Sequence, residues 1–225
     1  MHVSLVKYLP VILLCTALLT LQSACQGDQS NKPEGHRQSA PITVDRDIPL
    51  TNENAYDTVM RELEKDPNNL KAIYHLGDLY FRDGVYDKAV ENFRKVVNAD
   101  PSRGYVFYQM GTALSRSDHP EEAIKAFKQA IPKLREPAFA YNNMGITYGK
   151  LGRYEDEIDA LQKAIKSRPR YASARYNLGV TQIKVGDLEG AREQYEALNK
   201  LDLTMAKALL KEIEKAAPAA GTRER

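Results

Sequence analysis

The sequence predicts an all-α protein built from repeated pairs of helices. Four glycines, Gly77, Gly111, Gly145 and Gly179, stand 34 residues apart. A leucine or methionine precedes each of them, and an aromatic residue or leucine follows each of them sixteen positions later. Self-similarity at a fixed period of about 20–50 residues is typical of repeat architectures. Hydrophobic residues make up 43% of the 225-residue chain, which is enough apolar material for a core.

Residues 1–24 are predicted to be an export signal peptide and not part of the fold. Lys7 precedes an almost unbroken apolar run over residues 8–21, which is shorter than the roughly 20 residues that span a bilayer. The two small residues directly before Cys25 resemble the bacterial lipobox, whose cysteine is acylated and becomes the first mature residue. The motif is imperfect, because Leu21 stands one position earlier than its usual leucine. An uncleaved N-terminal anchor and plain secretion are the alternatives.

Residues 25–50 are predicted to be the lipidated cysteine followed by a flexible tether. They are polar, they are interrupted by three prolines, and they show no sustained helical or strand period. Gln26 stands where an aspartate, by resemblance to bacterial lipoproteins, would signal retention in the inner membrane. The resemblance therefore implies a bacterial cell-envelope protein that is anchored in the outer membrane and faces the periplasm or the cell surface. Without lipidation the protein would be secreted or periplasmic.

The repeats themselves resemble the tetratricopeptide repeat (TPR). Alanine, or Glu157 in one case, follows each glycine by twelve residues, and prolines such as Pro101 and Pro169 prevent the second helix of a pair from running on. Full repeats are expected at residues 70–103, 104–137, 138–171 and 172–205. The resemblance implies a right-handed α-α superhelix, a TPR solenoid, in which each repeat has an A helix that contains the glycine and a B helix.

Glycine and proline also predict the helix boundaries within the array. A short turn is expected between the A and B helices of each repeat, at Gly84, Asp118, Gly152 and Gly186. Pro132 falls near the end of the second B helix. Because proline disrupts a helix interior, that helix should stop near Ile131 and be followed by an irregular connection.

The glycine of each A helix has a packing explanation. Glycine in a helix costs about 1 kcal/mol relative to alanine. The missing side chain is expected to admit the B helix at its small residue, which is Ala89, Ala123 or Ala191. The third repeat departs from this pattern, because Glu157 replaces the alanine, and Gly145 and Gly149 form a GxxxG pair that leaves a notch or permits close helix packing. An unpaired buried charge is costly, so Glu157→Ala is expected to raise stability by about 1 kcal/mol.

The ends of the array are expected to be covered by single helices, since a terminal repeat exposes an apolar face. Residues 51–69 hold a partial repeat helix, in which Ala55, Val59 and Leu63 recur at four-residue spacing. Residues 206–225 are predicted to form a capping helix and a tail, with Thr204 as the N-cap.

The residues that could carry chemistry do not form a catalytic pattern. The formal net charge of +2 argues against an electrostatic nucleic-acid binder. The sequence contains no HExxH, GxSxG, phosphate-loop or CxxC motif, and its four histidines are scattered. We therefore expect no enzymatic activity, no cofactor and no bound metal ion.

The TPR resemblance instead implies a concave groove, lined by the A helices, that binds a peptide or protein segment. The first two repeats would contribute Lys71, Tyr74, Asp78, Phe81, Arg82, Tyr105, Tyr108, Thr112 and Arg116. The last two would contribute Phe139, Asn142, Asn143, Ile146, Lys150, Ser173, Tyr176, Asn177, Val180, Ile183 and Lys184. A basic column recurs every 34 residues within this set and favours an acidic partner segment: Arg82, Arg116, Lys150 and Lys184.

The aromatic residues of the groove are expected to matter more than the charges. A desolvated tyrosine can contribute 2 kcal/mol or more of binding free energy, whereas an exposed ion pair contributes about 0–1 kcal/mol. Tyr108→Ala is therefore expected to weaken capture of a partner more than Arg116→Ala.

The export signal and the repeats together predict a membrane-anchored interaction scaffold or adaptor in the bacterial cell envelope. It resembles pilotin-like lipoproteins, and equally lipoprotein adaptors that dock peptidoglycan enzymes, and it would bind another envelope protein or a peptide segment of one. The alternative is a periplasmic TPR lipoprotein that binds a small ligand for a transporter. That alternative would need a deep, closed pocket.

We predict that Cys25→Ala blocks acylation and leaves an uncleaved precursor, because the lipoprotein peptidase requires a modified thiol. Treatment with globomycin should produce the same precursor. The measurement is radioactive fatty-acid labelling of the expressed protein, and a label that survives the Cys25→Ala change would contradict the lipid anchor.

Overall fold

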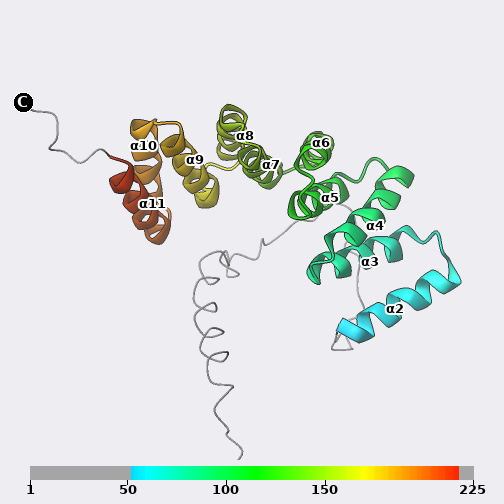
Figure 1. The fold of residues 1–225 in the computed structure, drawn as a ribbon. Helices are drawn as coiled ribbons and strands as arrows, with labels where there is room; N and C mark the ends of the chain where they lie inside the picture. The colour runs from blue at the N-terminus through cyan, green and yellow to red at the C-terminus, as the bar shows by residue number, and fades with distance from the viewer. Residues whose placement is uncertain (1–51, 218–225) are drawn as a thin grey trace, which may run out of the picture. The chain divides into compact units, whose positions relative to one another are not determined.

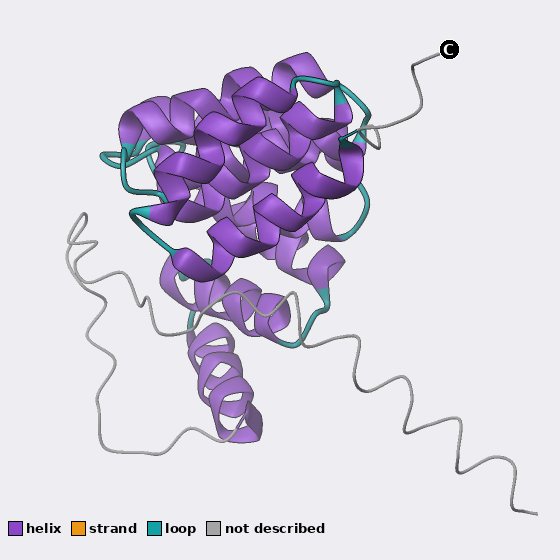
Figure 2. Ribbon diagram, turned by 90° about the vertical axis from the view of Figure 1, so that its left-hand side faces the viewer, coloured by secondary structure: helices purple, strands orange, loops and turns teal. Residues whose placement is uncertain are grey.

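A computed structural model describes residues 52–217, and all regular elements in this range are helical (Figures 1 and 2). The predicted signal peptide, Cys25, the tether over residues 25–50 and the tail from residue 218 onward lie outside the described residues. Within that range, none of the helices combines the length and the hydrophobicity needed to cross a bilayer.

The helices follow the predicted alternation of A and B helices. A single helix precedes the array, α2 (Asn52–Lys65), and another follows it, α11 (Leu203–Ala216). The A helices are α3 (Leu70–Arg82), α5 (Gly104–Arg116), α7 (Ala138–Lys150) and α9 (Ala172–Lys184). The B helices are α4 (Tyr86–Ala99), α6 (Pro120–Ala130), α8 (Tyr154–Ser167) and α10 (Leu188–Asn199). Each helix packs against the next in chain order, and α7 also contacts the neighbouring A helices α5 and α9. This arrangement is the α-α solenoid that the TPR resemblance implies.

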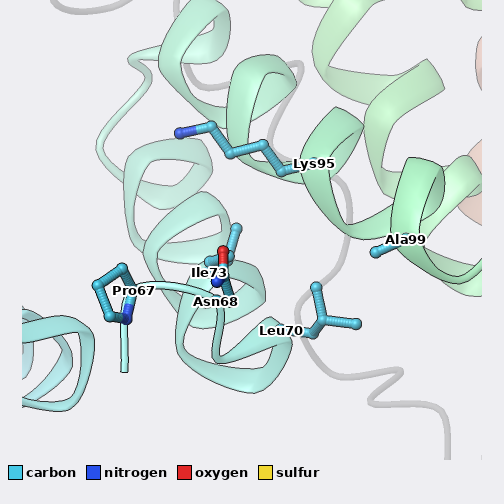
Figure 3. A pocket seen from close by; sticks show the side chains of 6 residues that line it. All are labelled: Pro67, Asn68, Leu70, Ile73, Lys95 and Ala99. Atoms are coloured by element: carbon cyan, nitrogen blue, oxygen red, sulfur yellow. The ribbon is translucent and has the colours of Figure 1, made fainter. Parts of the chain in front are cut away.

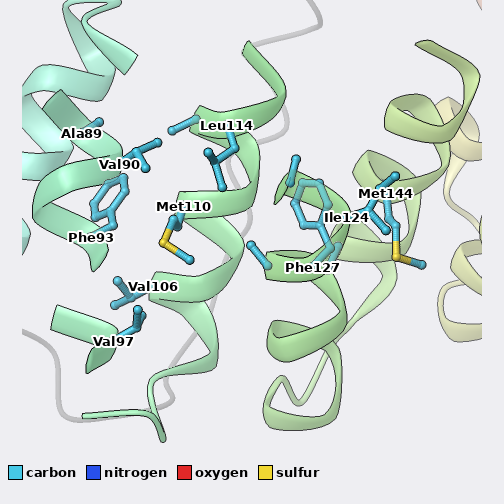
Figure 4. Close-up of a cluster of buried hydrophobic side chains, with 14 of the residues drawn as sticks. Ala89, Val90, Phe93, Val97, Val106, Met110, Leu114, Ile124, Phe127 and Met144 are labelled. Carbon is cyan, nitrogen blue, oxygen red and sulfur yellow. The ribbon is translucent and has the colours of Figure 1, made fainter. Parts of the chain in front are cut away.

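The buried side chains form a row of clusters along the array. Figure 4 shows part of the largest, in which Phe93 of α4, Met110 of α5 and Phe127 of α6 lie between consecutive helices. A second cluster joins α8 to α9 through Leu161 and Leu178, and a third joins α10 to α11. A repeat cannot bury its apolar face alone, so stacking on its neighbours supplies the core.

In the first three repeats the glycine of the A helix lies against a side chain of its B helix, but the contact differs from the predicted one. A Cβ on Gly77 would lie 2.8 Å from the Phe93 ring, and a Cβ on Gly111 would lie 2.9 Å from the Phe127 ring. The prediction that the glycine faces the B-helix alanine was therefore incomplete. The large side chain sixteen residues after the glycine fills the space first, because it is long enough to cross the gap between the helices.

The predicted turns are present between the A and B helices. Gly84, Gly152 and Gly186 have φ values of +77°, +68° and +84°, and Asp118 takes the same left-handed conformation at +64°. Glycine adopts this conformation without the steric cost that a Cβ brings. The second B helix, α6, ends at Ala130 and continues as a short 3-10 helix, Ile131–Lys133, as the position of Pro132 predicts.

The two terminal helices cover the ends of the described array. Ala55 and Val59 of α2 are buried, and α2 packs against α3. At the other end α11 packs against both α9 and α10, and a Cβ on Gly179 would lie 2.6 Å from Leu209. The predicted N-cap, Thr204, was wrong. Asp202 is the N-cap and accepts a hydrogen bond from the backbone N–H of Met205, because its carboxylate lies one residue before the first turn.

We predict that Gly152→Ala lowers the free energy of unfolding by about 1 kcal/mol, because an alanine Cβ is disfavoured at positive φ. No atom lies within 4 Å of the position of that Cβ, so the cost comes from the backbone alone. Gly152→Asn should cost less, since asparagine tolerates this conformation. Urea unfolding measures both, and equal losses would show that the backbone conformation is not the cause.

Candidate functional site

Three tyrosines of the predicted groove form a chain of rings across α3 and α5. The ring centroids of Tyr74 and Tyr105 are 6.4 Å apart, and those of Tyr105 and Tyr108 are 6.1 Å apart. Tyr74 packs on Phe93 and Tyr108 packs on Phe127, whereas Tyr105 is 50% exposed. Burial raises the pKa of all three phenols, so they are neutral hydrogen-bonding groups at physiological pH. Of these three tyrosines, Tyr105 is the most accessible to a partner.

A polar network continues from the tyrosines across α7 to α9. Asn143 donates through Nδ2 to the Tyr108 hydroxyl at 3.2 Å, and Asn142 donates to Asn143 at 3.3 Å. Asn177 of α9 then donates to Asn142 at 3.0 Å. Thr112 joins the same network, since its hydroxyl lies 3.5 Å from the amide nitrogen of Asn143. These bonds fix the predicted groove residues of three successive repeats relative to one another.

The basic column is present, and three of its four members reach back to the preceding repeat. The Arg116 guanidinium lies 5.5 Å from the Phe81 ring centroid and donates to the Tyr86 hydroxyl at 3.1 Å. Lys150 donates to the backbone carbonyl of Ser115. Lys184 also contacts the preceding repeat, since its Nζ lies 5.5 Å from the centroid of the Tyr154 ring. The fourth member pairs within its own helix, where Arg82 lies 2.5 Å from Asp78.

These contacts give the basic column a structural role that the sequence did not reveal. Cation–π contacts of this kind contribute about 0.5–1 kcal/mol when they are exposed. Cation–π contacts of Arg116 and Lys184 and a hydrogen bond of Lys150 thus connect these three side chains to the preceding repeats. Arg116 is therefore partly a packing residue.

Two predicted groove residues lie in first turns of their helices, away from the network. Lys71 is exposed in the first turn of α3. Phe139, in the first turn of α7, packs edge-on against Tyr171, with the two ring centroids 5.1 Å apart. The Arg168 guanidinium lies over the Phe139 ring, 5.2 Å from its centroid. Phe139 therefore contributes mainly to the joint between the third and fourth repeats.

The surface is hollowed between α7 and α9. The hollow has a volume of about 400 Å³. Six of the residues that line it are predicted groove residues: Ile146, Lys150, Tyr176, Asn177, Val180 and Lys184. The other three are Gly149, Thr181 and Glu157. The structure thus joins the GxxxG notch and the unusual glutamate, which the sequence showed only as separate departures.

Glu157 is buried in this hollow, with 5% of its surface exposed. Its carboxyl group occupies the space that a side chain at position 149 would fill, since a Cβ on Gly149 would lie 2.7 Å from the carboxyl carbon. Oε2 has no hydrogen-bond partner within residues 52–217. Burial raises the pKa of this carboxyl group, and the Thr181 hydroxyl and the Lys184 ammonium oppose the shift only in part.

Sequence reasoning missed Thr181 and the contact between Gly149 and Glu157. The sequence signal for this contact was that two positions of the third repeat, 149 and 157, both differ from their counterparts in the other repeats. The other repeats have Phe81, Ser115 and Ile183 at the position of Gly149, and alanine at the position of Glu157. A residue with a side chain replaced by glycine, beside an alanine replaced by glutamate, indicates that the glutamate takes space that the glycine leaves free.

A second hollow, of about 520 Å³, lies where the loop between α2 and α3 meets the end of α4 (Figure 3). Pro67, Leu70, Ile73 and Ala99 supply its apolar lining, and Asn68 and Lys95 supply its polar side chains. It includes none of the predicted groove residues. Among the described residues, no group of three or more His, Cys, Asp or Glu side chains is placed to hold a metal ion.

Comparison with known families decides the architecture. Models of the tetratricopeptide repeat match residues 70–103, 105–131 and 142–202, which together span more than half of the chain. The chain is a tetratricopeptide-repeat protein. No curated protein matches this TPR protein.

Several solved structures resemble the TPR protein over most of its length. A crystal structure of MamA matches with a TM-score of 0.61 and 26% identity, covering 74% of this chain and 91% of MamA. YrrB, described as a TPR protein with an unusual peptide-binding site, matches with a TM-score of 0.62 and 25% identity, covering 71% of this chain and 84% of its own. PilW, described as a widely conserved type IV pilus biogenesis factor, matches with a TM-score of 0.60 and 24% identity, covering 73% and 82%. The likeness to PilW shows the fold alone.

We predict that Glu157→Gln stabilises the protein at neutral pH by about 1 kcal/mol, because it removes a buried charge and keeps the side-chain volume. Glu157→Ala, the change that the sequence favoured, would also empty the space above Gly149. Since the folded-state pKa is raised, the folded protein binds the proton more tightly than the unfolded chain, and wild-type stability falls as pH rises above the ordinary value of 4.5. The advantage of Glu157→Gln should therefore shrink as pH is lowered towards 4.5.

Urea unfolding of both proteins between pH 4.5 and pH 7.5 measures this difference. Glu155→Gln is the matched control, because Glu155 is an exposed carboxylate in the same first turn of α8. A stability difference for Glu157→Gln that is independent of pH would show that the carboxyl group is already satisfied.

Proposed function

We propose that this TPR protein is a membrane-anchored interaction scaffold of the bacterial cell envelope, which binds a segment of another protein along its A helices. The network that joins Tyr108, Asn143, Asn142 and Asn177 carries this proposal. It holds side chains from three repeats in fixed relative positions, with Tyr108, Asn143 and Asn177 partly exposed and Asn142 buried beneath them. An extended segment can bind several such groups at once, and a surface fixed before binding loses little conformational entropy.

The two hollows favour a protein segment over a small ligand. Neither is an enclosed cavity. Small-molecule sites usually bury most of the surface of their ligand, which an open hollow does not do. YrrB, whose structure is similar, is described as having a peptide-binding site, and this supports the same class of ligand here.

The envelope location rests on the N-terminal sequence. The proposed lipid anchor is Cys25, and residues 26–50 would hold the repeats away from the membrane surface. A flexible chain of this length reaches about 28 Å root-mean-square. A partner that assembles an outer-membrane pore and a partner that remodels peptidoglycan both fit this geometry.

We predict that Tyr105→Ala weakens capture of the partner by roughly 30-fold. A desolvated tyrosine can contribute about 2 kcal/mol of binding free energy, and each 1.4 kcal/mol corresponds to a factor of ten. Tyr105 replaces Tyr108 in this test because Tyr108 packs on Phe127 and accepts a hydrogen bond from Asn143, so its removal would disturb the fold. The measurement is quantitative pull-down with the full chain from detergent-solubilised bacterial envelopes.

Lys128→Ala is the control, because Lys128 is exposed on a B helix, α6. Its capture should equal that of the wild type. A partner that is lost with Lys128→Ala and kept with Tyr105→Ala would place the binding surface on the B helices and contradict the proposal.

A further inference from the structure

The hollow between α7 and α9 contains a chemical feature that the scaffold proposal does not use. Glu157 is a buried acidic group that lines this hollow, and no repeat other than the third has an acidic residue at this position. Gly149 makes room for its carboxyl group, because any side chain at position 149 would collide with it. The glutamate is therefore accommodated by the fold, although it lacks a hydrogen bond at Oε2.

The two lysines that line the hollow, Lys150 and Lys184, do not pair with the Glu157 carboxylate. Lys150 donates to the Ser115 carbonyl, and Lys184 lies over the Tyr154 ring. Within residues 52–217, neither forms an ion pair with Glu157. Both lysines are exposed at the rim, where solvent and salt weaken their charge, whereas Glu157 is buried.

The rest of the lining fits the stem of a long side chain. Ile146, Val180 and the ring of Tyr176 supply apolar surface, while Asn177 and Thr181 supply polar side chains, and the Thr181 hydroxyl lies beside the carboxyl group. A lysine or arginine side chain matches this lining, because it has an apolar stem and a charged head. An anion would meet the carboxylate on the floor, and a purely apolar group would leave Oε2 unpaired.

We propose that this hollow binds a basic side chain, lysine or arginine, of the partner segment, with the Glu157 carboxylate as its hydrogen-bond acceptor. The inference rests on the proposed function, because it names one residue of the segment that the scaffold binds. A charged donor is the partner that best compensates a buried carboxylate, since charge-assisted hydrogen bonds are about twice as strong as neutral ones. It differs from the expectation of an acidic partner segment, which the basic column favours.

The test titrates the full chain in detergent with three small probes: Nα-acetyl-lysine methylamide, Nα-acetyl-arginine methylamide and Nα-acetyl-glutamine methylamide. The dissociation constants are measured from the methyl resonances of Ile146 and Val180, which line the hollow. The lysine or the arginine probe should bind about tenfold more tightly than the glutamine probe. A preference for one of the two basic probes identifies the head group as an amine or a guanidinium.

Two variants make the result specific. Glu157→Gln should abolish the preference for basic probes, and Glu155→Gln, which removes an exposed carboxylate from the same turn, should keep it. Equal binding of all three probes to the wild type would overturn the proposal, as would a preference that survives Glu157→Gln. Failure of the scaffold proposal is distinguishable, because it would appear as capture that is independent of Tyr105 while the preference for basic probes is intact.

Discussion

The close approach of a neighbouring helix at one glycine per repeat, the B helix in the first three repeats and α11 in the fourth, is the constraint on which this structure depends. At Gly77 and Gly111 the absence of a Cβ leaves room for a phenylalanine ring from the following helix, and at Gly145 a leucine takes the same place. Phe93, Phe127 and Leu161 are among the largest fully buried side chains of the described residues. A Cβ at Gly77 or Gly111 would lie within 3.0 Å of the ring, so the ring or the helix that holds it would have to shift and the close packing of the core would be disturbed.

Because each pair of helices has the same geometry, the A helices present equivalent positions side by side. This is why hydrogen bonds can run from Tyr108 through Asn143 and Asn142 to Asn177, across three repeats. The basic column uses the same regularity. Arg116 and Lys184 each contact a tyrosine thirty residues earlier, which places the charged group over the joint between two repeats. The contacts between neighbouring repeats are thus polar or cation–π at the surface and aromatic or aliphatic in the core.

The third repeat breaks the regularity in one coordinated way. Gly149 has no side chain, and the carboxyl group of Glu157 fills the space that a side chain there would occupy. The helices keep their lengths, since α7 and α8 are as long as their counterparts α3 and α4. A buried carboxylate of raised pKa lowers stability at neutral pH, so its presence in an otherwise regular repeat is explained better by binding than by folding.

The sequence by itself determined the repeat, because helical period, glycine spacing and proline position are local signals. It predicted the turns at Gly84, Gly152 and Gly186, the stop at Pro132, and most of the residues that line the hollow. Only the tertiary structure decided what those residues contact. Gly149 and Glu157 lie on different helices, and Lys150 and Ser115 lie in different repeats, so their distances depend on how the helices stack. The exposure of Tyr105 and the partial burial of Tyr108 were likewise decided by packing, since both belong to the same helix and only Tyr108 packs on the Phe127 ring.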